Sequence, residues 1–374
     1  MQEASVRVAG KRTTRRTAGR PVSAARGVPA TGGAATGGAA TIADPAAVRR
    51  RLLAWYALAR RDLPWRGGTD PYPVWVSEIM LQQTQVDRVK GFFIRFMARF
   101  PTVGALAAAR EQAVLKQWEG LGYYRRARQL HAAARKIVAD HGGEFPRNVA
   151  ALMGLPGIGR YTAAAIASIA MDIPAPIVEA NSRRVIARLA GHAEPVGGAG
   201  DEPIWALAAT LVPRKRAGAF NQALMDLGAM VCTPDRPLCQ RCPVAACCAA
   251  KQTGRVARIP AMAAPRATQR IHETAVVARH GDLVLVERRG PGEWWEGLWD
   301  FPRESAGRRG DSVVGRVAYT VTHHRIDCAV VERNPRRPSR AAPRQRWVKI
   351  ASLAGLAMTA PGRRIARLVA GPRR

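Results

Sequence analysis

The sequence predicts a mainly helical region over residues 45–250, followed by a small α/β domain over residues 271–370. Two observations lead to this prediction. Apolar residues recur every three or four positions through the first region, where no run alternates as a strand does. Beyond residue 270, four short runs are rich in β-branched residues, which favour strands. Between the two patterns lies a polar, basic stretch with two prolines, residues 251–270, which we expect to be a linker.

The composition is that of a folded and strongly basic protein. Hydrophobic residues make up 47% of the 374 positions, enough to build the cores of two domains. No apolar run approaches the roughly 20 residues needed to cross a bilayer. Lys and Arg number 59 against 27 Asp and Glu, and the resulting net charge of +32 favours a polyanionic partner such as nucleic acid. Because few of these basic residues are Lys, a GC-rich genome is an alternative source of the excess Arg.

Residues 1–44 are of low complexity, with seven basic residues and two acidic ones. This composition predicts a disordered basic arm, for which weak, nonspecific attraction to DNA is the candidate role. Arg15 and Arg16 are not followed by the apolar segment of an export signal, whereas the composition is compatible with an organelle transit peptide as an alternative. We expect a cytoplasmic, nucleoid-associated bacterial protein.

Helical spacing predicts helices at 48–61, 77–99, 111–119, 125–141, 161–171, 181–190, 204–211 and 221–230. Ser77 stands at the start of the longest. Because a serine there can accept a hydrogen bond from the free backbone N–H groups of the first turn, we expect Ser77 to cap this helix. In the second region, strands are expected at 274–279, 283–288, 317–321 and 326–331, with a loop at 335–343 and a terminal helix at 361–370.

Five of the six cysteines lie within 17 residues at the end of the helical region. Such clustering in a large chain indicates metal ligands in a reducing compartment and not a disulfide framework. Four follow the spacing Cys232-x6-Cys239-x2-Cys242-x5-Cys248. Four thiolates in one loop can hold a structural zinc ion or an iron–sulfur cluster. Cys247 is out of this register, and Cys328 is expected to be a small core residue.

A glycine-containing turn, Leu155–Gly159, joins two helical stretches. Gly157 and Gly159 permit the backbone conformations of a tight turn. They also let a phosphate approach bare N–H groups at the start of the next helix, where the helix dipole favours an anion. The turn is therefore a candidate helix–hairpin–helix. Together with the cysteine spacing, it resembles the endonuclease III superfamily, in which such a loop holds a [4Fe–4S] cluster.

The residues after the turn separate two reactions of that superfamily. An enzyme that also cleaves the DNA backbone needs a nucleophilic lysine to form a Schiff base with the sugar. Here Arg160 and Tyr161 follow the turn, and no lysine occurs between Lys136 and Lys215. The sequence therefore predicts a monofunctional glycosylase, which releases the base and leaves an abasic site.

Residues 63–248 resemble the catalytic region of the MutY family of adenine DNA glycosylases. The matching stretches are LPWR at 63–66, WVSEIMLQQTQV at 75–86, GLGYY at 120–124, the turn at 155–159 and FNQALMDLG at 220–228. The resemblance implies two helical lobes, a [4Fe–4S] cluster, and duplex DNA with adenine opposite 8-oxoguanine or guanine as the substrate. The implied cluster ligands are Cys232, Cys239, Cys242 and Cys248.

By that resemblance, Glu78 is the proton donor to the adenine ring. Protonation at N7 makes adenine a better leaving group, and a Glu enclosed by apolar groups can stay protonated near neutral pH. Tyr161 and Asn181 belong to the same catalytic group. The residues expected to hold the extruded adenine are Trp65, Arg66 and Gln222. The residues expected to contact the opposite guanine, or to wedge beside it, are Gln83, Thr84, Leu121 and Tyr123.

The family uses an aspartate after the hairpin helix to stabilise the positive charge that develops on the sugar. In this sequence the aligned residue is Glu179, and Ala180 replaces the usual glycine. The stem is longer by one methylene, roughly 1.5 Å, and a misplacement near 1 Å can cost on the order of 10²-fold in rate. Either the backbone is shifted to compensate, or excision is slow or lost and the protein binds mismatches.

The second domain resembles the C-terminal, Nudix-like domain of the same family, mainly through ERRGPGEWWEGLWDFP at 287–302. A Nudix hydrolase would continue with an acidic helix that holds Mg²⁺. Residues 303–312 form a short basic loop instead, so pyrophosphate hydrolysis is not expected. In the family this domain recognises 8-oxoguanine through an aromatic residue, a Ser or Thr, and a His. Thr322 and His323 match this pattern, whereas Val321 replaces the aromatic residue.

The sequence therefore favours a monomeric glycosylase of base excision repair that acts on double-stranded DNA and has no membrane attachment. Two alternatives remain. An endonuclease III-like lyase is opposed by the missing lysine and by the second domain. A non-catalytic mismatch-binding protein is motivated by Glu179.

Overall fold

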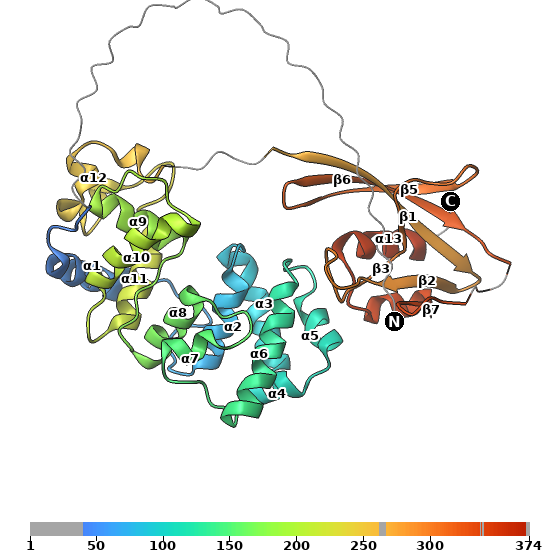
Figure 1. The fold of residues 1–374 in the computed structure, drawn as a ribbon, viewed down its shortest axis with the longest axis horizontal. Coiled ribbons are helices and arrows are strands. Elements are labelled where there is room, and N and C mark those ends of the chain that lie inside the picture. Colours follow the sequence, from blue (N-terminus) through green and yellow to red (C-terminus); the bar gives the residue numbers. More distant parts are fainter. Residues whose placement is uncertain (1–39, 262–266, 337, 339, 372–374) are drawn as a thin grey trace, which may run out of the picture. The chain divides into compact units, whose positions relative to one another are not determined.

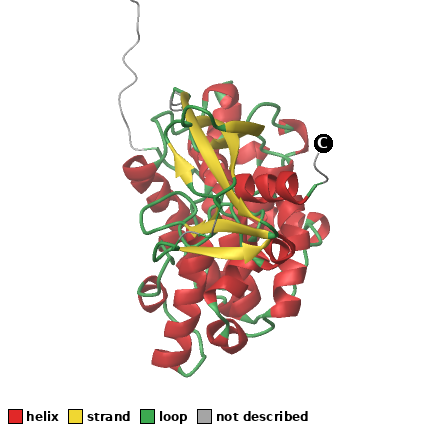
Figure 2. Ribbon diagram, turned by 90° about the vertical axis from the view of Figure 1, so that its right-hand side faces the viewer, coloured by secondary structure: helices red, strands yellow, loops and turns green. Residues whose placement is uncertain are grey.

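The computed structural model describes residues 40–261, 267–336, 338 and 340–371. Most of the basic arm expected over residues 1–44, and part of the expected linker, lie outside the described residues. In the part that is described, helices make up the first region and strands dominate the second, so the predicted order is confirmed. Figure 2 shows the helices in red and the strands in yellow. Within this same part of the chain, no helix combines the length and the apolar character needed to cross a bilayer.

The helices of the first region are drawn in blue to yellow in Figure 1. They are α1 Pro45–Ala59, α2 Pro71–Leu81, α3 Val86–Arg99, α4 Val103–Ala108, α5 Glu111–Trp118, α6 Arg125–His141, α7 Val149–Met153, α8 Arg160–Met171, α9 Ala180–Ala190, α10 Glu202–Leu211, α11 Ala217–Met230 and α12 Ala249–Gln252. A last helical turn ends at Arg258, so helical structure continues into the stretch that the sequence predicted to be linker.

These helices pack into two lobes with separate hydrophobic cores. Helices α2–α8 supply most of the first core, in which Trp75 and Trp118 are fully buried. Helices α1 and α9–α12 enclose the second, around Leu52 and Phe220. Tyr161 in α8 packs against both cores. Because α8 also contacts α2 and α11, the residues of these helices that were predicted to be functional lie where the two lobes join.

The helix expected over residues 77–99 is two helices, and the prediction that Ser77 caps it is wrong. Helix α2 starts earlier, because the Asp70 carboxylate caps its backbone and Pro71 occupies its first turn. Ser77 is buried inside α2, where its hydroxyl donates to a backbone carbonyl one turn back at 2.8 Å. The chain then turns at Gln83, which adopts φ 56°, before α3 begins.

The glycine turn joins α7 to α8. Gly157 adopts φ +75°, and a Cβ atom at this position would lie 2.6 Å from the Cβ of Gln129 on α6, so no larger residue fits without movement. Gly159 forms the N-terminal boundary of α8, and no side chain caps that end of the helix. The backbone N–H groups at the start of α8 are therefore not bound by a capping side chain, as expected for a site that receives a phosphate.

The second region is a mixed sheet with one long helix. Its elements are β1 Gln269–His280, β2 Leu283–Arg288, β3 Trp299–Asp300, β4 Arg303–Glu304, β5 Ser312–Val321, β6 His324–Arg333, β7 Gln345–Lys349 and α13 Ala360–Ala370. The main strand order is β3-β2-β1-β6-β5, with β4 beside β1 and β7 beside β2. Strands β1 and β6 run parallel, and β5 and β6 form an antiparallel hairpin. The turn of this hairpin carries Thr322 and His323.

Candidate active site

Glu78 lies on α2 and is only 5% exposed. The hydroxyl of Tyr161, on α8, donates a hydrogen bond to its Oε2 atom. The pKa of Glu78 is raised to about 7, mainly by burial and also by the nearby charge of Glu179, whereas the Tyr161 hydrogen bond and the positive charge of Arg66 oppose this shift. A carboxyl group in these surroundings is protonated in a large fraction of molecules at neutral pH, as a proton donor must be.

Tyr161 is the partner that keeps the Glu78 side chain in place. Burial is the largest cause of a pKa well above the usual tyrosine range, and the neighbouring charges of Glu78 and Glu179 add to it. The phenol therefore keeps its proton and acts as a hydrogen-bond donor. The sequence placed Tyr161 in the catalytic group, but it gave no partner for the hydroxyl.

Glu179 caps the N-terminus of α9. Its two carboxylate oxygens accept hydrogen bonds from the backbone N–H groups of Asn181 and Ser182, each at 2.8 Å. The Ser182 hydroxyl in turn accepts from the Glu179 N–H at 2.8 Å, which completes a reciprocal capping box. Its influence on the pKa values of Glu78 and Tyr161 means that this carboxylate lies near both. The structure therefore brings the two predicted carboxylates to one site.

Asn181, in the first turn of α9, is linked through Arg184 to α11 and to the cysteine loop. Its Oδ1 atom accepts from Arg184 at 2.9 Å, and the same guanidinium donates to the backbone carbonyls of Gly228 and Cys232, both at 2.7 Å. The Cβ of Asn181 also packs closely on Gly228, because a Cβ added there would lie 2.6 Å away. The first turn of α9 is thus held against α11 and against the start of the cysteine loop.

The residues expected to hold the extruded base line a narrow cavity next to Glu78. This cavity has a volume of about 40 Å³, and its lining includes Trp65, Arg66, Glu78 and Gln222. A larger cavity of about 380 Å³ shares Trp65, Arg66 and Gln222 with it. The structure therefore brings these predicted residues together. An adenine would enter only after the side chains around the smaller cavity move, since about 40 Å³ is close to the volume of one water molecule.

Asp226 is a residue of this site that the sequence analysis missed. It is fully buried on α11 and accepts two hydrogen bonds from Arg66, at 2.7 and 2.9 Å, and a third from Arg61 at 2.6 Å. A buried carboxylate needs such partners, and this one holds Arg66 at the edge of the pocket. An acidic residue inside an apolar helical stretch was the signal in the sequence that could have revealed it.

The residues expected beside the opposite guanine lie on two neighbouring loops. Gln83 and Tyr123 adopt left-handed backbone conformations with φ of 56° and 48°, which non-glycine residues rarely do. Tyr123 is 51% exposed, whereas Leu121 is buried in the core, so Tyr123 is the better placed of the two to enter DNA. Strained backbone of this kind is found at binding sites, where the surrounding structure holds it.

Arg126 joins these two loops, a role that no motif in the sequence indicates. It is buried on α6, and its guanidinium donates to the Ile79 carbonyl at 2.7 Å, the Thr84 hydroxyl at 3.3 Å and the Gly122 carbonyl at 3.2 Å. Thr84 is thereby held beside the loop that presents Tyr123. The geometry therefore brings Gln83, Thr84 and Tyr123 to one edge of the first lobe.

The cysteine loop encloses a small cavity that is separate from the carboxylates. The cavity has a volume of about 20 Å³. The four cysteines of the predicted register line it, namely Cys232, Cys239, Cys242 and Cys248. Cys247 does not line it, and Cys328 is buried in the core of the sheet domain. Among the residues that the structure describes, no three His, Cys, Asp or Glu side chains have an arrangement that could hold a single metal ion.

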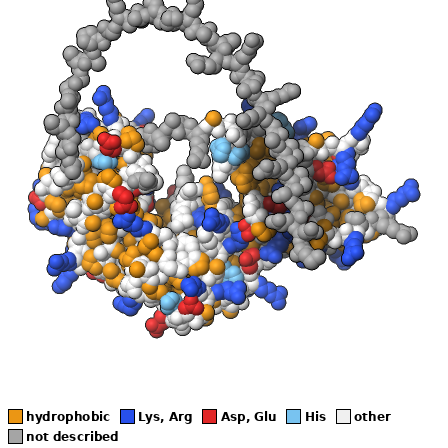
Figure 3. All heavy atoms as spheres, in the orientation of Figure 1, with side chains coloured by type: hydrophobic (Ala, Val, Ile, Leu, Met, Phe, Trp, Pro, Cys, Tyr) orange, Lys and Arg blue, Asp and Glu red, His pale blue; other side chains and the backbone are white. Residues whose placement is uncertain are grey.

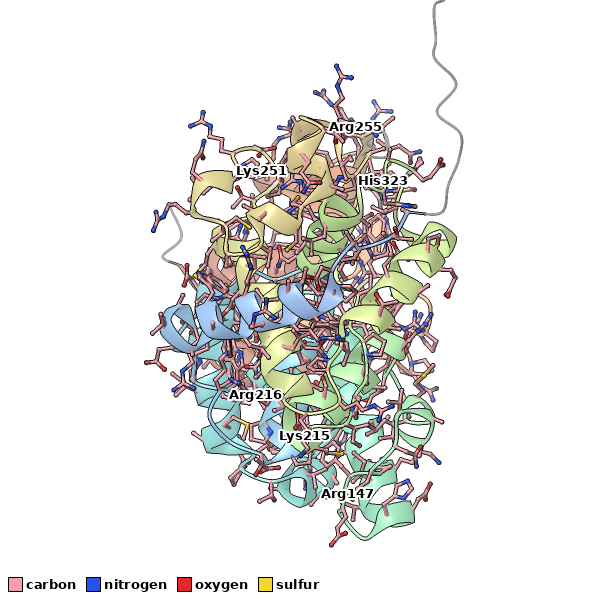
Figure 4. The ribbon with its side chains drawn as sticks, turned by 90° about the vertical axis from the view of Figure 1, so that its left-hand side faces the viewer. Arg147, Lys215, Arg216, Lys251, Arg255 and His323 are labelled. Atoms are coloured by element: carbon pink, nitrogen blue, oxygen red, sulfur yellow. The ribbon has the colours of Figure 1, made fainter. Side chains whose placement is uncertain are left out.

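Arg188 of α9 binds the backbone of this loop through hydrogen bonds. It is buried, and it donates to the Thr233 carbonyl at 2.7 Å and the Pro234 carbonyl at 3.0 Å, while its guanidinium lies 3.3 Å from the Cys232 sulfur. These contacts fix the backbone of the loop next to Cys232. Lys251 and Arg255, just beyond the loop, extend into solvent (Figure 4).

In the sheet domain, Thr322 and His323 form the turn between β5 and β6. Thr322 adopts φ 53°, and its hydroxyl lies 3.4 Å from an imidazole nitrogen of His323.

The acidic residues that follow the Nudix-like stretch are engaged in ion pairs, since Glu304 and Asp311 both pair with Arg333, at 2.8 and 2.7 Å. The loop therefore has no free carboxylate pair of the kind that holds Mg²⁺ among these residues.

Basic side chains are spread over the surface. Blue Lys and Arg atoms are more numerous than red Asp and Glu atoms on the face in Figure 3. Lys215 and Arg216, just before α11, and Arg147, just before α7, are exposed and are labelled in Figure 4. This distribution favours contact with a polyanion along more than one element.

Comparisons with known proteins find relatives of both regions. The HhH-GPD superfamily of base excision DNA repair proteins matches residues 76–197, and the NUDIX domain family matches residues 274–368. Adenine DNA glycosylase of Rattus norvegicus is 44% identical over 280 residues, which make up 71% of this chain and 53% of the rat protein. Adenine DNA glycosylase of Mycolicibacterium smegmatis is 44% identical over 238 residues, 63% of this chain and 79% of the bacterial protein.

The chain therefore spans about half the length of the mammalian relatives it matches. Among solved structures, that of a thermostable thymine-DNA glycosylase is similar, with a TM-score of 0.50 and 32% sequence identity. The match covers 56% of this chain and 97% of the thymine-DNA glycosylase.

Proposed function

The chain belongs to the adenine DNA glycosylases of the HhH-GPD superfamily, and on this premise we propose that it excises adenine mispaired with 8-oxoguanine or guanine in duplex DNA. The reaction is hydrolysis of the N-glycosyl bond, which leaves an abasic site. One observation carries the proposal. Glu78 is buried with a pKa raised to about 7, is hydrogen-bonded to Tyr161 and lies within electrostatic reach of Glu179.

Glu78 acts as the general acid. Because the Tyr161 hydroxyl donates a hydrogen bond to Oε2 of Glu78, the other oxygen is the one left to carry the acidic proton. Glu78, Trp65, Arg66 and Gln222 line the same cavity, so an adenine held there has its ring nitrogens close to the acid. Proton transfer to N7 lets the base leave as a neutral molecule and not as an anion.

Glu179 supplies the negative charge that stabilises the sugar as the base departs. Two backbone N–H groups bind its oxygens, and the N-terminus of α9 favours an anion. Acid-assisted glycoside cleavage requires one carboxylic acid and one carboxylate, and Glu78 and Glu179 take these two roles. Water then attacks the sugar carbon. The observation in favour of this role is that the capping box holds the longer side chain in a single, fixed orientation.

The reaction stops at the abasic site. A lyase step needs an amine nucleophile, and the residue that follows the hairpin is Arg160, whose guanidinium pairs with Glu202 at 2.8 Å. The chain contains no lysine between Lys136 and Lys215. DNA is held at the N-terminus of α8 and by the exposed basic residues, and the sheet domain reads the opposite base through Thr322 and His323.

We further propose that Cys232, Cys239, Cys242 and Cys248 hold a [4Fe–4S] cluster. The support is that these four thiols line one cavity, while Cys247 does not, and that Arg188 places a positive charge beside them. Such a cluster would fix the shape of a basic surface loop and has no step in the base-removal reaction. Iron and sulfide analysis of the purified protein, with the ultraviolet–visible spectrum, separates it from zinc. Four iron atoms per chain are expected, and stoichiometric zinc would refute the assignment.

The function is tested with an end-labelled duplex that carries one adenine opposite 8-oxoguanine. Cleavage at the adenine only after alkali treatment is the expected result. Cleavage without alkali would indicate a lyase, and binding without product at stoichiometric protein would indicate a mismatch-binding protein. Opposite-base variants with guanine and thymine establish the preference.

The variant Glu78→Gln should abolish adenine release and retain binding to the mispaired duplex, because the amide fills the same space but cannot donate an acidic proton. Glu202→Gln makes the same chemical change at an exposed position of the second lobe and should keep full activity. Undiminished turnover by Glu78→Gln would remove Glu78 from the mechanism.

A further inference from the structure

The hairpin turn of the sheet domain has an exposed aromatic neighbour that comes from a different loop. Trp294 lies in the segment between β2 and β3 and is 40% exposed. Among the described residues, it and Tyr123 are the exposed large aromatic side chains. The indole ring centre is 5.1 Å from that of His324, whose ring is 4.0 Å from that of His323. The three rings therefore form a continuous surface.

The Trp294 side chain is presented by an ordered loop. The next residue, Trp295, adopts φ 61° and packs its ring 5.5 Å from Tyr319 in the sheet. The two ends of the loop are joined, since the Gly297 N–H donates to the Arg289 carbonyl at 3.0 Å. One tryptophan is thus anchored on the sheet while its neighbour remains at the surface. A water-exposed indole fixed in this way loses little conformational freedom when it binds a flat partner.

The chemistry beside Trp294 is that of a nucleobase site. Thr322 places its hydroxyl 3.4 Å from an imidazole nitrogen of each histidine, so the turn that meets the indole through His324 offers one donor–acceptor group and two rings with polar nitrogens. Bases are recognised by stacking on aromatic rings together with hydrogen bonds to their edges. Val321, the last residue of β5 before the turn, offers no such face. The exposed ring nearest the turn is that of Trp294.

We propose that Trp294 is the stacking residue for the base opposite the excised adenine, with Thr322 and His323 contacting the edge of that base. This inference rests on the proposed function and adds a specificity-determining residue to it. A purine has the largest ring face of the natural bases and is the partner that gains most from the indole. The 8-oxo form adds a carbonyl oxygen and an N–H to the edge, which a hydroxyl and an imidazole can bind.

The test measures binding without catalysis. The full-length protein is titrated with three duplexes, in which a non-cleavable 2′-fluoroadenosine lies opposite 8-oxoguanine, opposite guanine or opposite thymine. Trp294→Ala should bind the 8-oxoguanine duplex about 5- to 150-fold more weakly, the range that loss of one stacked base produces. The thymine duplex should be bound with nearly unchanged affinity. Trp294→Phe should restore most of the loss, since it keeps an aromatic face.

Val313→Ala is the matched control, because Val313 is a 54% exposed side chain of the same sheet, on β5. It should bind all three duplexes as the parent does, and circular dichroism should show that each variant is folded. An unchanged affinity of Trp294→Ala for the 8-oxoguanine duplex, or an equal loss on all three duplexes, overturns the inference. Because the adenine analogue cannot be excised, a parent protein that fails to release adenine would refute the proposed function without altering this outcome.

Discussion

Burial of Glu78 should destabilise the folded protein in a way that depends on pH. The unfolded chain loses this proton around the model-compound value of 4.5, whereas the folded protein keeps it up to a pKa of about 7. Between these values the folded state binds the additional proton, so stability falls as pH rises, and above about 7 the full penalty is present. Glu78→Gln removes the ionisable group and should therefore stabilise the protein at high pH.

The magnitude follows from the size of the pKa shift. A shift from 4.5 to about 7 corresponds, at 1.36 kcal/mol per unit, to about 3 kcal/mol. At pH 8 we expect Glu78→Gln to be more stable by about 3 kcal/mol, and at pH 5 by about 1 kcal/mol. The amide oxygen can still accept the hydrogen bond from Tyr161, so little is lost in packing. A stabilising substitution at a buried polar site is unusual and is therefore informative.

Urea unfolding at both pH values measures the difference, with the slope of the transition checked for equality between variants. Glu202→Gln is again the control, because its carboxylate is exposed, and it should change stability by less than about 0.5 kcal/mol at either pH. An advantage of Glu78→Gln that is the same at pH 5 and pH 8 would show that the buried carboxyl does not hold its proton, and the assignment of the general acid would be lost.

Three further predictions concern the reaction. In single-turnover assays on adenine opposite 8-oxoguanine, the excision rate should fall about tenfold per pH unit above about pH 7, as Glu78 loses its proton; a flat profile to pH 9 would contradict this. Tyr161→Phe removes the hydrogen bond that lowers the pKa of Glu78, so the falling limb should move to higher pH; a shift to lower pH would be contrary evidence. Glu179→Asp should excise as fast as the parent or faster; a collapse in rate would show that the site is built around Glu.

The sequence predicted the order of the two regions and most of the elements, because apolar periodicity and β-branched runs reflect burial within each element. The prediction failed where one residue type is compatible with two local structures. Ser77 has the chemistry of a cap, but Asp70 and Pro71 provide a stronger helix start about two turns earlier. The break before α3 depends on the left-handed backbone conformation of Gln83, and no residue pattern in that stretch predicts this conformation.

The candidate site was predictable as a set of residue positions and not as a network. Motifs located Glu78, Tyr161 and Arg66, but their partners come from distant segments. Asp226 binds Arg66 across 160 positions of the chain, and Arg126 reaches the Ile79 carbonyl across 47. Side chains that act by binding backbone carbonyls leave no pattern, since every residue has a carbonyl. Such contacts become visible only once the helices are packed.

The two carboxyl groups of the site are held by different physical means. Glu78 lies inside a helix among apolar neighbours, where desolvation favours the neutral form. Glu179 caps the first turn of α9, where two backbone N–H groups bind its oxygens. The N–H groups, and not the length of the stem, determine where these oxygens lie. We therefore propose that the extra methylene at position 179 is accommodated between the backbone and the carboxyl group that the helix holds, so that Glu can take the role of the shorter residue.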